Sequence, residues 1–297
     1  MALHHKRTGR ARRAAAIGVV AVALLAAGCS ATERGDADAE HHSEPAAVAG
    51  ALPSQHVHAV TRNPADGHVL LATHDGLFRL APGASPARVG PVIDLMGFTV
   101  AGPRHFYASG HPGPGTDLPN PVGLIESTDG GQTWSVLSRQ GRSDFHTLTA
   151  SAAGIVGYDG DQLASTADGR TWQALTPPVP PHAVAATPDG STLLVSSEQG
   201  LARSADRGRT WARVTTPSLM QLVTFADATH AVAVAPDGRI AISADAGATW
   251  RPAGSVGGAP HALAARRTTA GSEILAVTGA GLLRSVDDGA TFAPYRP

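Results

Sequence analysis

The chain has 297 residues, of which 42% are hydrophobic and 16% are charged, and its formal net charge is -1. This composition is too apolar for a disordered chain and too poor in Lys and Arg for a nucleic-acid-binding protein. Its single cysteine excludes a disulfide framework and a multi-thiolate zinc site. The 34 glycines and 22 prolines indicate many turns and favour an all-β architecture.

Residues 1–28 are predicted to be an export signal. Five cationic residues between Lys6 and Arg13 precede residues 14–27, an apolar run without a charge. A run of about 14 residues is too short to cross a hydrocarbon core of about 30 Å, but it suits the hydrophobic region of a signal peptide. Lys6 is the only lysine, so no catalytic lysine is expected after cleavage.

The end of this signal, Leu-Leu-Ala-Ala-Gly-Cys-Ser over residues 24–30, resembles the lipobox of bacterial lipoproteins. The resemblance implies cleavage before Cys29, lipidation of its sulfur and anchoring to the outer face of the plasma membrane. Residues 29–51 are predicted to be this cysteine and a flexible tether, because they carry acidic and His residues but almost no large apolar side chains. The lipid would be the only link to the membrane, since cleavage leaves 18 Lys and Arg against 24 Asp and Glu.

An octet of the form Ser-x-Asp-x-Gly-x-Thr-Trp recurs along the rest of the chain. Complete copies begin at Ser127, Ser204 and Ser243, the copy at Ser285 ends in Phe, and the copy at Ser165 has its aspartate displaced by one place. The successive spacings are 38, 39, 39 and 42 residues. A period of about 40 residues is typical of a four-stranded propeller blade.

These octets resemble the Asp-box (BNR) repeat of sialidases, sortilin-type receptors and photosystem II assembly factors. The resemblance implies that the box residues are structural, so these aspartates are expected to hold turns: Asp129, Asp168, Asp206, Asp245 and Asp287. A carboxylate in such a turn can accept its N–H groups, while the Thr and Trp begin the next strand and pack between blades. Residues 52–297 have room for six blades, the first without a box. We therefore predict an all-β, six-bladed propeller over this range.

A His or Met is expected near the start of the innermost strand of every blade. When the blades are aligned on their boxes, the equivalent residues are His58, Met96, His146, His182, Met220 and His261. Alternation along a strand turns one set of residues toward the channel, so we expect these six to converge at one mouth. Imidazole and thioether donors suit soft or borderline metals, copper above all. The sequence shows no phosphate-binding loop, so no nucleotide cofactor is expected.

The loops between the second and third strands are expected to open on the same mouth. They carry His74, His111 and Asp159, and His56 alternates with His58. These groups would add ligands or orient the imidazoles of the ring. The simpler alternative is that His and Met side chains merely fill a narrow channel and bind water.

The function that best fits these patterns is a monomeric, non-catalytic metal-binding propeller. The resemblance to sialidases suggests an exo-sialidase-like glycoside hydrolase as an alternative. Sialidases, however, clamp a carboxylate with three arginines, the first in an Arg-Ile/Leu-Pro motif, and this sequence has no such motif. A second alternative is a scaffold that docks a membrane or secreted protein on one mouth.

Overall fold

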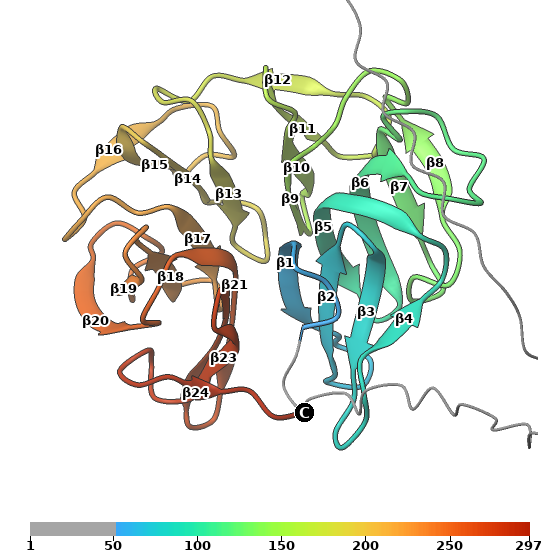
Figure 1. The fold of residues 1–297 in the computed structure, drawn as a ribbon. Coiled ribbons are helices and arrows are strands. Elements are labelled where there is room, and N and C mark those ends of the chain that lie inside the picture. Colours follow the sequence, from blue (N-terminus) through green and yellow to red (C-terminus); the bar gives the residue numbers. More distant parts are fainter. Residues whose placement is uncertain (1–51) are drawn as a thin grey trace, which may run out of the picture. The chain divides into compact units, whose positions relative to one another are not determined.

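The computed structural model describes residues 52–297; the predicted signal, Cys29 and the tether lie outside the described residues. All helix or strand structure in the described range is β-strand, and this range has no helix that is long and apolar enough to cross a bilayer. The strands form six four-stranded antiparallel sheets around a central axis (Figure 1). The predicted six-bladed β-propeller is confirmed.

Each blade is one continuous stretch of chain. Blade 1 contains β1 (Val57–Arg62), β2 (Val69–Thr73), β3 (Gly76–Leu80) and β4 (Ala87–Val89). Blade 2 contains β5 (Ile93–Gly102), β6 (His105–Pro112), β7 (Leu124–Ser127) and β8 (Ser135–Ser138). Blade 3 contains β9 (Thr147–Ser151), β10 (Gly154–Tyr158), β11 (Leu163–Thr166) and β12 (Gln173–Leu175).

The second half of the ring repeats this arrangement. Blade 4 contains β13 (Ala183–Ala186), β14 (Leu193–Ser197), β15 (Gly200–Ser204) and β16 (Ala212–Val214). Blade 5 contains β17 (Leu222–Phe225), β18 (Ala231–Val234), β19 (Arg239–Ser243) and β20 (Arg251–Ser255). Blade 6 contains β21 (Pro260–Thr268), β22 (Gly271–Thr278), β23 (Gly281–Ser285) and β24 (Ala293–Pro294).

In every sheet the strands follow chain order, and the first strand of each blade contacts the first strands of its neighbours around the axis. Second strands such as β2 and β22 are buried along their whole length, whereas the outer strands β4 and β24 are mostly exposed. A strand that is covered on both faces is expected to be almost continuously hydrophobic. The second strands are apolar along their length because each blade lies between two others.

Six apolar clusters hold the blades together, one at each interface. The aromatic residues of the boxes pack against five of them: Trp134, Trp172, Trp211, Trp250 and Phe292. Trp172, for example, stacks on Phe145 with ring centroids 4.7 Å apart. The packing role predicted for the tryptophans is confirmed.

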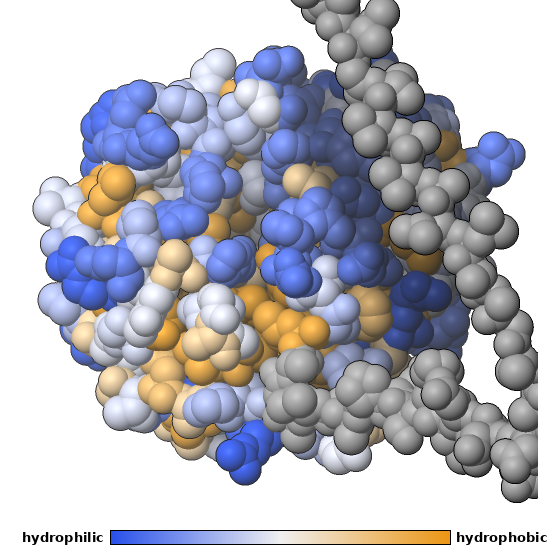
Figure 2. Space-filling model, in the orientation of Figure 1, coloured by the Kyte–Doolittle hydropathy of each residue, from blue (hydrophilic) through white to orange (hydrophobic). Residues whose placement is uncertain are grey.

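On the face shown in Figure 2, hydrophilic residues dominate the upper half, and apolar residues gather below the centre.

The Asp boxes are closed hydrogen-bonded turns. In the first box the Ser127 hydroxyl donates to Asp129 Oδ1 at 2.8 Å and accepts the Gly131 N–H at 2.8 Å. Thr133 donates its N–H to Asp129 Oδ1 and its hydroxyl to Oδ2, at 3.0 and 2.6 Å. Gly131 has a φ of 91°, and a Cβ there would lie 2.5 Å from Leu77, so glycine is required. The carboxylate thus serves the turn and is not free for chemistry.

The box of blade 3 uses a different register from the one that the sequence suggests. Thr166, not Ser165, donates to Asp168 Oδ1, at 3.0 Å. Thr166 is 3% exposed, like the box serines of the other blades. The turn is therefore one residue shorter between its aspartate and Gly169, with Thr166 in the serine position.

Side chains, not a shared strand, join the first blade to the last. The Glu273 carboxylate of β22 is 1% exposed and binds Arg62 of β1 at 2.7 Å, together with Arg266 and Arg284. Arg62 also donates to the Tyr295 hydroxyl at 3.2 Å. Burial alone would raise the pKa of Glu273, but the hydrogen bonds from Arg62 and Arg266 outweigh it and lower the pKa to about 2.

We expect Glu273→Gln to open this junction. The substitution leaves Arg62 facing a neutral partner in a buried position, so the free energy of unfolding should fall by about 3 kcal/mol. Urea denaturation measures the change. Asp237→Asn is the matched control, because the Arg239–Asp237 pair is exposed and should contribute little. Equal stability of the two variants would contradict a closing role for Glu273.

The box carboxylates should make the fold sensitive to acid. The Thr hydroxyl and N–H groups lower the pKa of Asp129, Asp206, Asp245 and Asp287 from 3.8 to about 2. Their contribution to stability is complete above about pH 4 and is lost as the pH falls through 2, because the unfolded chain takes up protons first. Asp245→Asn and Thr249→Val should both give a shallower loss of stability between pH 4 and 2, measured by urea unfolding at each pH. Slopes that match the parent chain would refute this role.

Candidate metal centre

The innermost strands begin at one mouth of the channel, and three of them bulge there. The extra residue between successive ladder pairs is His58 in β1, Met96 in β5 and His261 in β21. A bulge re-aims the side chain of its extra residue. The equivalent residues of blades 3 and 4, His146 and His182, come directly before β9 and β13 and donate their backbone N–H groups to the second strand. We call this place in each blade the ring position.

Blade 5 departs from the sequence alignment by one residue. Leu222 pairs with Val234, and the N–H of Gln221 donates to the Val234 carbonyl, as the N–H of His182 does to Ser196. Gln221 therefore has the ring position. Met220 is 1% exposed and lies in the apolar cluster between blades 4 and 5. Since a shift of one residue reverses the face of a strand, the expectation that Met220 faces the channel is wrong.

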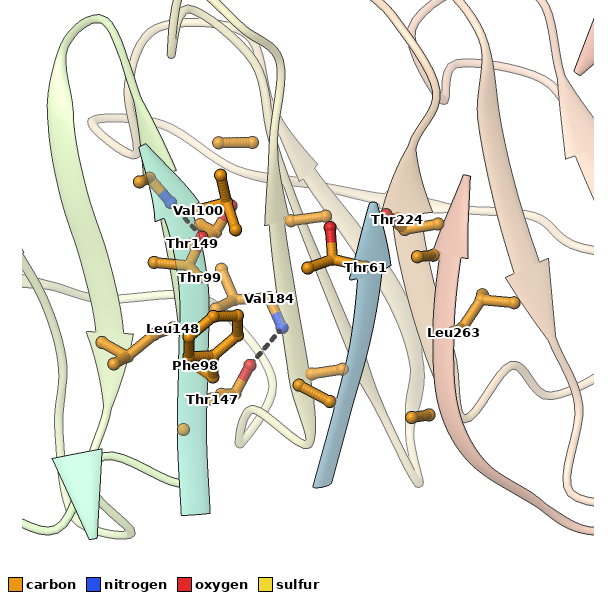
Figure 3. Close-up of a pocket in the computed structure, with 18 of the residues that line it drawn as sticks. Thr61, Phe98, Thr99, Val100, Thr147, Leu148, Thr149, Val184, Thr224 and Leu263 are labelled. Atoms are coloured by element: carbon orange, nitrogen blue, oxygen red, sulfur yellow. Dashed lines mark hydrogen bonds between the residues drawn. The ribbon is translucent and has the colours of Figure 1, made fainter. Parts of the chain in front are cut away.

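The channel contains a cavity of about 620 Å³. His58, Met96, His146 and His261 are among the residues that line it, whereas His182 is exposed and does not. Figure 3 shows the walls beside them, where threonine and apolar side chains from neighbouring blades alternate. Thr99 accepts the N–H of Ala150 at 3.1 Å, and Thr147 accepts that of Val184 at 3.3 Å, so these hydroxyls also link the blades. The six predicted residues do not form one ring around a shared point.

A smaller group of donors does converge, between blades 1 and 2. One nitrogen each of His58 and His74 and one oxygen of Asp94 all lie within 4.8 Å of one another. His74 Nδ1 is 2.7 Å from Asp94 Oδ1, yet this approach lacks hydrogen-bond geometry, so Oδ1 has no hydrogen-bond partner. His58 Nε2 is also buried without one. Buried polar atoms are normally paired, and a cation between these three would pair them all.

Local backbone structure places these three side chains. His58 is the bulged residue of β1, and His74 follows β2 in a turn closed by the Thr73 hydroxyl, which donates to the Gly76 carbonyl at 2.9 Å. Asp94 lies in β5, opposite His111 of β6. The next residue of β6, moving toward the strand start, is Gly110, where a Cβ would lie 1.9 Å from the Asp94 carbonyl oxygen. Only glycine allows β6 to approach the bulge this closely.

The surroundings of His58 favour its neutral state. Burial, and then the neighbouring His74, lower the pKa of His58, while Asp94 opposes the shift. The His58 and His74 rings meet edge to face with centroids 4.5 Å apart, and His56 packs on His74 at 4.9 Å. A neutral imidazole is the form that binds a metal. His56 therefore lies at the same mouth, as the sequence predicts, but as a neighbour of His74.

A second group lies between blades 2 and 3. Asp144 Oδ2 is 2.7 Å from His146 Nε2 and 3.2 Å from His111 Nε2. The hydrogen bond that His146 Nε2 donates to Asp144 raises the pKa of His146. Asp159 accepts a hydrogen bond from the Ser143 hydroxyl at 2.7 Å and lies 3.6 Å from Arg139, so its carboxylate is already occupied.

Sequence reasoning missed Asp94 and Asp144, which supply the only carboxylates in the two groups. Each lies two residues before a ring position, as His56 does before His58. Residues two apart share a face of a strand, so the alternation that selects His56 would also have selected both aspartates.

Comparison with known proteins supports the fold and the repeat. The family model of the BNR/Asp-box repeat matches residues 125–136, which include the whole of the first octet. The chain is thus a six-bladed β-propeller that carries BNR/Asp-box repeats. No curated protein matches the sequence.

Several solved propellers are similar in structure. The Niastella koreensis GH74 enzyme has a TM-score of 0.59 and 18% identity over 81% of this chain, which spans 37% of that enzyme. YCF48 bound to D1 peptide has a TM-score of 0.52 and 19% identity, over 81% of each chain. A chain of the nidogen/laminin complex has a TM-score of 0.59 and 13% identity, over 77% of this chain and 93% of that one. Likeness at these identities establishes the fold alone.

The pKa of His58 should report on the geometry of its group. His74→Ala should raise this pKa because it removes a repelling imidazole, and Asp94→Asn should lower it further because it removes an attracting carboxylate. His56 and His146 also lower it, by smaller amounts. Titration of the histidine ring protons by NMR measures each shift. His230→Ala, which removes an imidazole bound to Asp227, is the control and should leave His58 unchanged. The opposite order of shifts would contradict this arrangement.

Proposed function

We propose that the protein binds a divalent transition-metal ion through His58, His74 and Asp94. The observation that carries the proposal is the meeting of three donor atoms within 4.8 Å, two of them buried and without a hydrogen-bond partner. Three protein ligands on two adjacent blades would hold the ion at the rim of the cavity and leave a coordination position open. The proposed role is binding, with no reaction assigned.

Two imidazoles and one carboxylate favour a borderline ion over a soft one. The preference for Cu⁺ rested on two methionines in the ring, and Met220 lies in the core. Zn²⁺ and Cu²⁺ both suit nitrogen and oxygen ligands, and Cu²⁺ binds more tightly to a given site of this kind. Copper therefore remains the proposed ion, in its divalent state at this site.

Export and anchoring through Cys29 complete the proposal. A lipid at Cys29 would hold the metal-binding mouth outside the cell on a tether that ends near residue 51. Labelling with a radioactive fatty acid tests this directly. Incorporation that persists in Cys29→Ser would refute the anchor.

The alternative activity, glycoside hydrolysis, has weaker support. Three arginines do gather in the structure, but at the opposite ends of the inner strands, where they surround Glu273 and neutralise it. Asp94 and Asp144 lie beside imidazoles, not as the free pair of carboxylates that such hydrolysis needs. Release of fluorophore from a panel of aryl glycosides would favour the hydrolase over the binding module.

We expect His58→Ala, His74→Ala and Asp94→Asn each to weaken binding of Zn²⁺ and Cu²⁺ at least about 100-fold. Loss of a residue that only orients a ligand typically weakens metal binding about 10- to 100-fold, and loss of a ligand itself should weaken it more. Competition of the full-length protein against a chromophoric chelator measures the dissociation constant. His261→Ala is the matched control, because it removes another imidazole from the cavity wall, and it should leave the affinity unchanged. Absence of competition by the parent protein would refute the function.

A further inference from the structure

We propose that the mouth holds a second metal site, formed by Met96, His111 and Asp144, and that this site takes a softer ion, Cu⁺. It lies one blade further along the ring from the first site. It uses none of the residues of the first site, so neither site depends on the other.

The blade repeat relates the two sites. Val57 of β1 pairs with Thr73, and Leu95 of β5 pairs with Gly110. The residues that come directly after Thr73 and Gly110 are His74 and His111, which are therefore equivalent. The metal donors of the first site thus have a structural counterpart in blade 2.

The other two positions of the first site also repeat. His58 and Met96 are the bulged residues of their innermost strands. Asp94 lies two residues before the ring position of blade 2, and Asp144 lies two residues before His146, the ring position of blade 3. The set His58, His74 and Asp94 therefore becomes Met96, His111 and Asp144 after one step around the ring.

A further step does not give a third site. The residues that the same register brings to these positions are His146, Gly160 and Pro180. Glycine and proline offer no side-chain ligand. The complete set of donors thus occurs at two neighbouring junctions and breaks off at the next.

The contact between His111 and Asp144 resembles that between His74 and Asp94. His111 Nε2 lies 3.2 Å from Asp144 Oδ2 without hydrogen-bond geometry, and Asp144 Oδ1 is buried without a partner. His111 Nδ1 is 2.8 Å from the Asn120 side-chain oxygen, which can only accept. The proton of a neutral His111 therefore lies on Nδ1, and the lone pair of Nε2 faces a carboxylate oxygen. A cation bound at Nε2 would pair this nitrogen with the Asp144 carboxylate, whose Oδ1 has no other partner.

The change of one donor predicts the change of ion. In the second site a thioether takes the place of the His58 imidazole, and His146 is hydrogen-bonded to Asp144 Oδ2, which orients this carboxylate. Thioether and imidazole ligands favour Cu⁺ over the harder divalent ions. Asp144 supplies a negative charge that balances the ion, and Asn120 holds His111 in the binding tautomer.

The test titrates the full-length protein with Cu⁺, without oxygen, and separately with Zn²⁺, each against a chromophoric chelator. Met96→Leu and His111→Ala should weaken Cu⁺ binding at least tenfold and leave Zn²⁺ binding unchanged; a factor of about 10 is the lower end for loss of an outer contact. His74→Ala and Asp94→Asn should do the reverse. X-ray absorption of the Cu⁺ form should show a copper–sulfur distance that Met96→Leu removes. Circular dichroism confirms that each variant is folded.

Unchanged Cu⁺ affinity in both Met96→Leu and His111→Ala, or an absorption spectrum without sulfur, would overturn the second site. The parent protein binding Zn²⁺ but no Cu⁺ would also overturn it while leaving the proposed function intact. The reverse result, Cu⁺ binding without Zn²⁺ binding, would leave the second site standing and remove the first.

Discussion

The register between the first two strands of each blade determines which side chain meets the channel. Side chains alternate along a strand, so one extra residue at the strand start turns a core residue into a channel residue. In blades 1, 2 and 6 a bulge supplies this residue, and it is His58, Met96 and His261 in turn. In these three blades the bulge therefore decides which side chain of the inner strand faces the mouth.

The ring itself depends on burial between blades. Each sheet is apolar on both faces near the axis and polar at its outer edge, so it is stable only between two others. Six apolar clusters meet this need, and the Asp boxes hold the turns from which the packed aromatic residues project. The aspartates of the boxes are strongly acidic because they accept hydrogen bonds from Thr and Ser, which is a structural cause and not a catalytic one.

The two ends of the channel differ in their charged side chains. At the start of the inner strands, imidazoles meet carboxylates that keep an unpaired oxygen. Near the end of β1 and β21, three arginines surround one buried carboxylate and join the last blade to the first. The first arrangement is open to a cation, whereas the second is complete in itself. This contrast supports a binding role at the histidine end and a structural role at the arginine end.

The sequence by itself determined the fold, because five boxes in phase define the blade length, and the tryptophans mark the packing position in each blade. It also brought His56, His58 and His74 to one mouth, whereas His111, expected in a loop, lies near the end of β6. Only the tertiary structure decided which donors meet. Met220 and Gln221 both precede β17, which has no bulge, and no local pattern settles which of them takes the ring position. Asp94 and Asp144 reach the imidazoles across blade interfaces, and such contacts depend on how whole sheets pack, not on spacing within one segment.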